Sequence, residues 1–274
     1  MNAVVSFIDG IAASLGCTMS SSDLTLKMVL TVFILVFIGG FMDAIAGGGG
    51  LITLPAYLMS GLPAHVALGT NKTSSCLGSS VAVVRYVRSG YVKWSLALPC
   101  IVLAICGSSA GTNLQLRLSD VYLKYILLFV LPVVAVIVLR RRSLPEAPGD
   151  ISFKKQLLVC CLAALVIGMY DGFYGPGTGT FLLLIFCNLA KLDVRTANGN
   201  TKLVNFSSNI AAFATSLMNG QVFILLGLIG AVASMSGNYL GSGLAIKNGS
   251  KIVRPTVIAV LILLVIKVLT GLKG

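Results

Sequence analysis

The sequence predicts an all-α, polytopic membrane protein, on the basis of an apolar composition, long apolar segments and an internal repeat. Of the 274 residues, 57% are hydrophobic and only 10% are charged, and the mean hydropathy is +0.97. A soluble domain usually carries about 25% charged residues. Apolar segments at 29–40, 121–139 and 255–269 approach or reach the roughly 20 residues that a helix needs to cross a bilayer.

The chain is also strongly basic, with a formal net charge of +12. Such a charge can indicate nucleic acid as a partner. Here the basic residues lie in short loops between apolar segments, where flanking charge orients membrane helices. We therefore expect the chain to lie in the lipid bilayer and to bind no nucleic acid.

Ten apolar segments follow one another along the chain. Two are short, at about 49–60 and 179–190, and each directly follows a glycine cluster. The others are long enough to be about eight full transmembrane helices. They lie at about 26–46, 66–84, 94–113, 121–139, 157–174, 197–217, 222–246 and 254–272.

A basic linker divides the chain into two halves. The polar interval RRRSLPEAPGD (140–150) opens a predicted cytoplasmic linker over 140–156, between a first transmembrane repeat (27–139) and a second (157–274). The N-terminal segment 1–26 precedes both repeats and lacks a basic n-region. We therefore do not expect it to be a cleaved signal peptide.

The two halves resemble each other at glycine, aspartate and lysine positions. FMDAIAGGGG (41–50) aligns with MYDGFYGPGT (169–178), and ALGTNKTSS (67–75) aligns with ANGNTKLVN (197–205). The second register continues without a gap to GSSAG (107–111) and GNYLG (237–241). Because small residues four apart let helices approach closely, we expect close helix pairs at both places.

Loop charge predicts that the two repeats are inverted relative to each other. The loop at 85–93 carries three basic residues, whereas its partner at 215–221 carries none. The loop near 114–120 has one basic residue, whereas 247–254 has three. By the positive-inside rule, 85–93 and the linker are cytoplasmic and both termini face outside. Inverted repeats with broken helices are typical of secondary transporters, whose site lies near the midplane.

The glycine clusters predict two half-helices inside the membrane. Irregular backbone is tolerated there only where protein or a water-filled cavity borders it. The free N–H groups and positive dipole end of a half-helix form a cradle for an anion. The alternative is that these glycines only allow tight packing. The predicted cradle consists of Gly48, Gly49, Gly50, Gly177 and Thr178.

Two lysines at equivalent positions extend this predicted site. Lys72 and Lys202 each lie deep in an apolar segment, where a lysine is costly unless it faces a cavity, is paired, or snorkels to the interface. Ammonium, hydroxyl and amide donors suit a small oxyanion. The polar neighbours that we assign to the substrate site are Asn71, Thr73, Asn200, Thr201 and Asn205.

Asp43 and Asp171 are the acidic residues at the two breaks. They could pair with the lysines or titrate in proton coupling, which makes a proton or a sodium ion a candidate coupling partner. The alternative is a capping role beside the glycine break.

The two repeats resemble the signatures of a known family. GGFMDAIAGGGGLITLPAYLMSGLPAHVALGTNKTSS with RYVRSGYVKW, and GMYDGFYGPGTGTFLLL with TANGNTKLVNFSSNIAAF, are similar to the sulfite exporter TauE/SafE family, also called the 4-toluene sulfonate uptake permease family. The resemblance covers roughly 27–270. It implies a multi-pass permease of the bacterial-type inner membrane for sulfur-containing anions such as sulfite, sulfoacetate, taurine-derived sulfonates or thiosulfate.

The sequence thus predicts a secondary transporter that moves a small sulfur-containing oxyanion by alternating access. An anion channel, a permease for a non-sulfur organic anion, and a non-transporting sensor or scaffold remain alternatives. We expect no enzyme, because the single histidine, His65, lies in a short turn and no HExxH occurs. The seven cysteines include no CxxC pair, so we expect neither a metal nor a cofactor.

Overall fold

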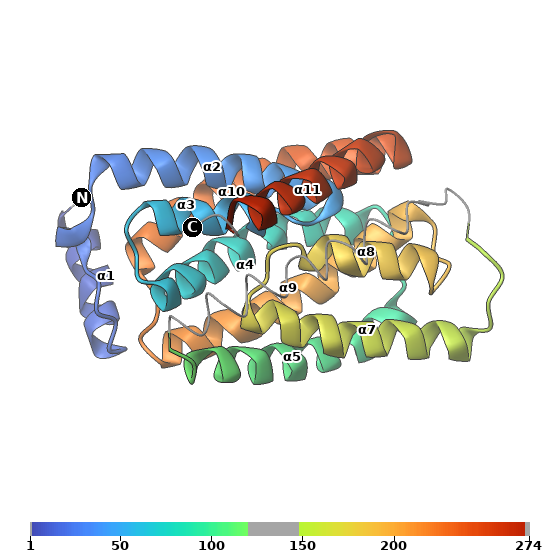
Figure 1. Cartoon of the computed structure of the whole chain (residues 1–274), viewed down its shortest axis with the longest axis horizontal. Coiled ribbons are helices and arrows are strands. Elements are labelled where there is room, and N and C mark those ends of the chain that lie inside the picture. Colours follow the sequence, from blue (N-terminus) through green and yellow to red (C-terminus); the bar gives the residue numbers. More distant parts are fainter. Residues whose placement is uncertain (1, 120–147, 272–274) are drawn as a thin grey trace.

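The structure is a computed structural model that describes residues 2–119 and 148–271 (Figure 1). Within these ranges it is entirely helical, with ten α-helices, one short 3-10 helix and no strand. The all-α prediction is therefore confirmed. The predicted segment 121–139 and the part of the linker before residue 148 lie outside the described residues.

The helices follow the predicted segments closely. Each predicted segment within the described ranges overlaps one helix, and the ends differ by four residues at most. The helix at 2–14 was not predicted. In chain order the elements are α1 (Asn2–Ser14), the 3-10 helix η1 (Ser21–Asp23), α2 (Leu26–Ala46), α3 (Gly50–Met59), α4 (Ala64–Arg88), α5 (Trp94–Leu116), α7 (Phe153–Phe173), α8 (Thr178–Asn188), α9 (Val194–Met218), α10 (Ile224–Asn248) and α11 (Ser250–Gly271).

Among the described helices, four are both long enough and apolar enough to cross a membrane, namely α2, α5, α7 and α10. This supports a polytopic membrane protein. It does not support the predicted number of about eight full spans. The central helices α4 and α9 have 25 residues each, but polar side chains buried in the protein make them less apolar. Length and mean apolarity therefore do not identify α4 and α9 as spans.

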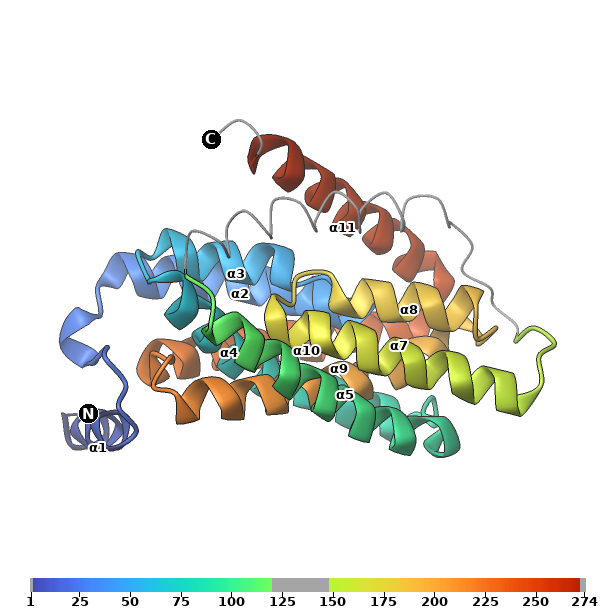
Figure 2. The ribbon, with the colours of Figure 1, turned by 60° about the horizontal axis from the view of Figure 1, so that its bottom comes forward.

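The helices of the two sequence repeats have the same order and nearly the same lengths. In each repeat a helix of 21 residues is followed by a short one, of 10 residues in α3 and 11 in α8, and then by two long ones. The first helix of each repeat packs against the fourth helix of the other, α2 on α10 and α7 on α5. Helices α4 and α9 contact each other between these two pairs (Figure 2).

Glycines make the two outer helix pairs close, as the small-residue patterns predicted. A Cβ atom on Gly107 or Gly111 of α5 would collide with backbone atoms of α7. A Cβ on Gly237 or Gly241 of α10 would collide in the same way with the backbone of α2. Because the side chain is absent, the backbones of each pair meet directly, and the expected close approach is confirmed.

We expect Gly111→Ala to destabilise the protein. The added methyl would collide with the carbonyl oxygen of Met169, so α5 and α7 must separate. Overpacking of this kind typically costs about 1–3 kcal/mol. Thermal unfolding of the detergent-solubilised protein should show a lower Tm for Gly111→Ala. The control is Gly10→Ala, where no atom lies within 4 Å of the added methyl. Equal Tm values for the two variants would contradict the close packing.

Candidate functional site

Both glycine clusters break a helix in the middle of the bundle. Between α2 and α3, Gly47 and Gly48 have φ angles of 73° and 82°, which favour glycine. Between α7 and α8, Gly175 and Gly177 have φ angles of 97° and 90°. Figure 1 shows that α3 and α8 run in opposite directions from these two breaks. The predicted short segments are therefore helices that begin inside the bundle.

The N-termini of α3 and α8 lie against each other. A Cβ on Gly47 would collide with the backbone of Gly179, and a Cβ on Gly50 would lie 3.1 Å from Pro176. Thr180 of α8 donates a hydrogen bond of 3.0 Å to the carbonyl oxygen of Ala46. The first N–H groups of a helix have no partner within the helix, and its dipole is positive at this end. Two such ends are thus brought together at one place.

A small cavity lies at this junction. Its volume open to water is about 30 Å³, room for roughly two water molecules. The predicted site residues that line it are Asp43, Gly48, Gly49, Gly50, Asn71, Lys72, Asp171, Gly177, Thr178 and Asn205. The lining residues that the sequence analysis did not single out are Gly39, Gly40, Thr53, Ser75, Gly175, Gly179, Asn209, Ser234 and Asn238.

Each lysine pairs with the aspartate of the other repeat. The Nζ atom of Lys72 lies 2.9 Å from Oδ2 of Asp171, and Nζ of Lys202 lies 2.9 Å from Oδ2 of Asp43. All four side chains are largely or fully buried. Salt-bridge pairing was one of the three roles that the sequence left open for the aspartates. The four charges sum to zero.

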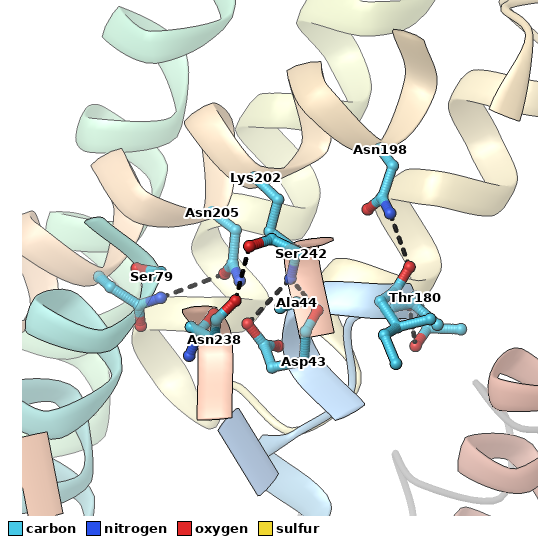
Figure 3. Close-up of polar contacts among 12 residues, drawn as sticks. Asp43, Ala44, Ser79, Thr180, Asn198, Lys202, Asn205, Asn238 and Ser242 are labelled. Carbon is cyan, nitrogen blue, oxygen red and sulfur yellow. Dashed lines mark hydrogen bonds and ion pairs between the residues drawn. The ribbon is translucent and has the colours of Figure 1, made fainter. Parts of the chain in front are cut away.

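The two ion pairs differ in how they face the cavity. Lys72 lines the cavity and also donates a hydrogen bond of 3.0 Å to Oδ1 of Asn209. Lys202 is fully buried behind Asp43, whose backbone carbonyl it also contacts (Figure 3). The sequence analysis assigned the two lysines the same role. The structure brings only Lys72 to the cavity, while Lys202 reaches it through Asp43.

Three further predicted residues also lie outside the lining. Thr73 donates to the carbonyl oxygen of Gly69, one turn earlier on its own helix. Asn200 likewise donates to the carbonyl oxygen of Thr196, and Thr201 is fully buried. Neighbouring positions on a helix point in different directions, so proximity in sequence to a lysine does not place a side chain at the cavity.

Buried polar groups without partners surround the cavity. Among the lining residues, the side-chain oxygens of Thr53, Asn71 and Asn238 are buried and find no hydrogen-bond partner among the described residues. A buried polar atom without a partner is costly. These atoms are therefore available to a bound ligand or to water. Asn238 was detectable in the sequence only as an amide inside an apolar segment.

In the part of the chain that the structure describes, the histidine and the cysteines do not line this cavity. His65 lies at the start of α4, beside Gln115 of α5. In the described ranges, no group of three or more His, Cys, Asp or Glu side chains is placed to hold a metal ion. The cysteines that the structure describes are all free thiols.

Comparison with known proteins gives consistent matches over most of the chain. The family model described as Sulfite exporter TauE/SafE matches residues 32–268. The probable membrane transporter protein ORF9 of Sinorhizobium sp. is 36% identical over 247 residues, which cover 90% of this chain and 94% of the relative. A probable membrane transporter protein of Haemophilus influenzae is 34% identical, with 86% and 92% coverage. The probable membrane transporter protein YfcA of Escherichia coli K12 is 31% identical, with 89% and 90% coverage. No solved structure matches.

Proposed function

Since the chain belongs to the sulfite exporter TauE/SafE family, a family of multi-pass membrane transporters, we propose that it is a secondary transporter for a small sulfur-containing oxyanion such as sulfite or an organosulfonate. The observation that carries this proposal is the meeting of two half-helix N-termini beside Lys72 at one buried cavity. Backbone N–H groups, two positive dipole ends and an ammonium group all favour a negative charge at this place.

The size of the cavity favours a compact ligand. Its volume of about 30 Å³ leaves room for a few heavy atoms only, unless the surrounding helices move apart. The lining consists of glycines, amides, hydroxyls and three charged side chains, with no large apolar side chain among the residues that form it. A pyramidal or tetrahedral oxyanion offers several acceptor oxygens to such donors. This is the chemistry of sulfite and of the sulfonate head group.

We further propose alternating access between two inverted repeats. In Figure 1, α2 and α4 run from left to right, whereas their counterparts α7 and α9 run from right to left. Opposite directions are what inverted repeats require, and a site at the repeat interface is typical of such transporters. The cross-repeat ion pairs of Lys72 and Lys202 lie at this interface. Movement of one repeat against the other would change the access to both ion pairs from each side of the membrane.

The orientation in the membrane is a testable part of this proposal. Residues 85–93 and 140–156 should be cytoplasmic, and 215–221 and the C-terminus should lie outside. In Figure 1 the turn after α4 and the turn after α9 lie at opposite ends of the bundle. A cysteine at position 219, in a cysteine-free background, should react with an impermeant thiol reagent on intact cells, and one at position 89 only after the cells are opened. The reverse pattern would contradict the orientation.

A binding experiment tests the substrate class. Purified protein in detergent should gain thermal stability with sulfite, thiosulfate or a small sulfonate, because a ligand that binds the folded state raises its stability. Carboxylates of similar size serve as the comparison, and sulfate and taurine extend the series. Stabilisation by carboxylates alone would favour the alternative of a permease for a non-sulfur organic anion. No stabilisation by any anion would contradict the proposed site.

An anion channel is the second alternative. A channel could contain the same glycine breaks and the same ammonium group. The small cavity with paired charges favours a transporter, because an open pore through these residues would have to break both ion pairs. Flux that rises linearly with anion concentration and never saturates would favour the channel.

A further inference from the structure

We propose that Asp171 carries a proton that moves with the anion, in a one-to-one symport; this deepens the proposed function and rests on it. Two observations support this inference. The first is the charge balance of the cavity, and the second is a hydroxyl group that can serve either protonation state of Asp171. Among the described residues, no hydroxyl group donates to the equivalent carboxylate, Asp43.

Charge balance makes an added anion costly. Lys72 and Lys202 are already neutralised by Asp171 and Asp43 at 2.9 Å. An anion that enters the cavity must compete with a carboxylate for the Lys72 ammonium group. With both carboxylates ionised, the buried site would then carry a net negative charge, which is strongly unfavourable away from water. One proton taken up by a carboxylate offsets one charge of the anion.

Ser208 of α9 is placed to stabilise Asp171 in both states. Its Oγ lies 2.7 Å from Oδ2 of Asp171 and 2.9 Å from the carbonyl oxygen of Asn205. A hydroxyl has one proton and can donate to only one of these acceptors at a time. When Asp171 is ionised, Ser208 donates to the carboxylate. When Asp171 is protonated, its own O–H donates to Oγ of Ser208, and the Ser208 proton turns to Asn205.

Lys72 also has a second partner for the protonated state. Its Nζ lies 3.0 Å from Oδ1 of Asn209, so it keeps one hydrogen bond when Asp171 becomes neutral. The ammonium group is then free to pair with the anion in the cavity that it lines. On the opposite side of the membrane the anion leaves, the proton leaves Asp171, and the Lys72–Asp171 pair forms again.

The second ion pair has no such arrangement. In the repeat register Gly78 occupies the position of Ser208, and a Cβ there would collide with Oγ of Ser234. Among the described residues, the Asp43 carboxylate accepts a side-chain hydrogen bond from Lys202 and none from a hydroxyl group. Lys202 also contacts the backbone carbonyl of Asp43 and is fully buried. Asp43 therefore acts as a fixed counter-charge. The charged and titratable groups around Asp171 are Lys72 of α4, the Asp43–Lys202 pair across the cavity and the phenol of Tyr170.

Proteoliposomes with an internal pH dye test the inference. Methanesulfonate is a suitable probe, because it remains a monoanion near neutral pH; the membrane potential is clamped with potassium and valinomycin. Inward methanesulfonate flux through the wild type should acidify the lumen by about one proton per anion. Asp171→Asn should lose this acidification, and its uptake driven by a pH gradient should fall at least tenfold. Exchange of internal for external methanesulfonate should persist and lose its pH dependence.

Matched variants keep the result interpretable. Asp150→Asn removes an exposed carboxylate in the linker and should leave the proton signal intact. Asp43→Asn should retain acidification in proportion to whatever flux remains. Ser208→Ala keeps all four charges, so it tests the proposal even if Asp171→Asn fails to fold; it should lower gradient-driven uptake more than exchange.

The outcomes separate this inference from the proposed function. Anion exchange in the wild type without proton movement, or with a requirement for sodium instead, would overturn the proton symport and leave the transporter standing. Acidification that persists in Asp171→Asn would remove Asp171 as the carrier. If thiosulfate, sulfite and methanesulfonate all fail to exchange, the proposed function fails and the inference falls with it.

Discussion

Replacing Gly47 by alanine should reduce transport by at least a hundredfold. The added methyl would collide with the backbone of Gly179 and Thr180, at the point where the two half-helices meet. Unlike a flexible side chain, this backbone cannot move aside without separating the N-termini of α3 and α8. A donor displaced by even 1 Å from a bound ligand can cost about 100-fold in activity. Uptake by proteoliposomes at equal reconstituted amounts measures the effect.

The chain contains a well-matched control for this substitution. Gly61 has a φ angle of 85°, close to the 73° of Gly47, but no atom lies within 4 Å of a Cβ built on it. Both alanine variants therefore have the same unfavourable backbone conformation, and only Gly47→Ala has the collision. Gly61→Ala should transport almost as well as the wild type. Normal transport by a well-folded Gly47→Ala would show that the helix ends need not abut.

Replacing Lys72 by glutamine should weaken apparent anion affinity by about ten- to a hundredfold. The ammonium group lines the cavity, and a charge-assisted hydrogen bond typically contributes about 1.5–3 kcal/mol. A loss of about 1.4 kcal/mol corresponds to a factor of ten. The measurement is the half-saturation concentration of uptake. Lys154→Gln, which changes an exposed lysine near the start of α7, should leave that concentration unchanged.

A double variant separates two causes of this loss. Lys72→Gln also leaves Asp171 without its partner, and the bare carboxylate would itself repel an anion. Lys72→Gln with Asp171→Asn removes that repulsion but does not restore the ammonium group. If Lys72 binds the anion directly, the double variant should remain weak. Recovery of wild-type affinity would show that Lys72 only neutralises Asp171.

Lys202 should behave differently because it is fully buried behind Asp43. Its removal leaves a mostly buried carboxylate unpaired, and breaking a buried pair in this way typically costs about 3–5 kcal/mol. The expected effect of Lys202→Gln is therefore mainly a lower Tm. This differs from the equal roles that the sequence suggested for the two lysines.

Local signals allowed much of this architecture to be predicted. Glycine clusters and apolar runs are signals that can be recognised within a short stretch of sequence. They predicted the ends of the half-helices α3 and α8 and of the described long helices to within four residues. The amphipathic helix α1 was missed because 2–14 has no long apolar run. The exchange of partners between the repeats, α2 with α10 and α7 with α5, could not be predicted, because it depends on tertiary packing.

The site was predictable in outline and not in detail. Equivalent positions indicated Lys72 and Lys202, but one sequence does not reveal that each pairs with the aspartate of the other repeat. Sequence proximity suggested Thr73 as a site residue, but Thr73 does not line the cavity, whereas Ser75, three residues after Lys72 and on the same helix face, does. Asn209, seven residues after Lys202, was not identified because nothing local distinguishes it from other amides.

Counterflow is the measurement that tests the central claim most directly. Proteoliposomes are loaded with a high concentration of the sulfur anion that most raises the Tm, and diluted into a trace of the same labelled anion. An alternating-access transporter should take up label transiently above equilibrium, and Gly47→Ala should not. Labelled anion that enters only to equilibrium, at a rate that never saturates, would contradict a transporter with one buried site reached from each side in turn.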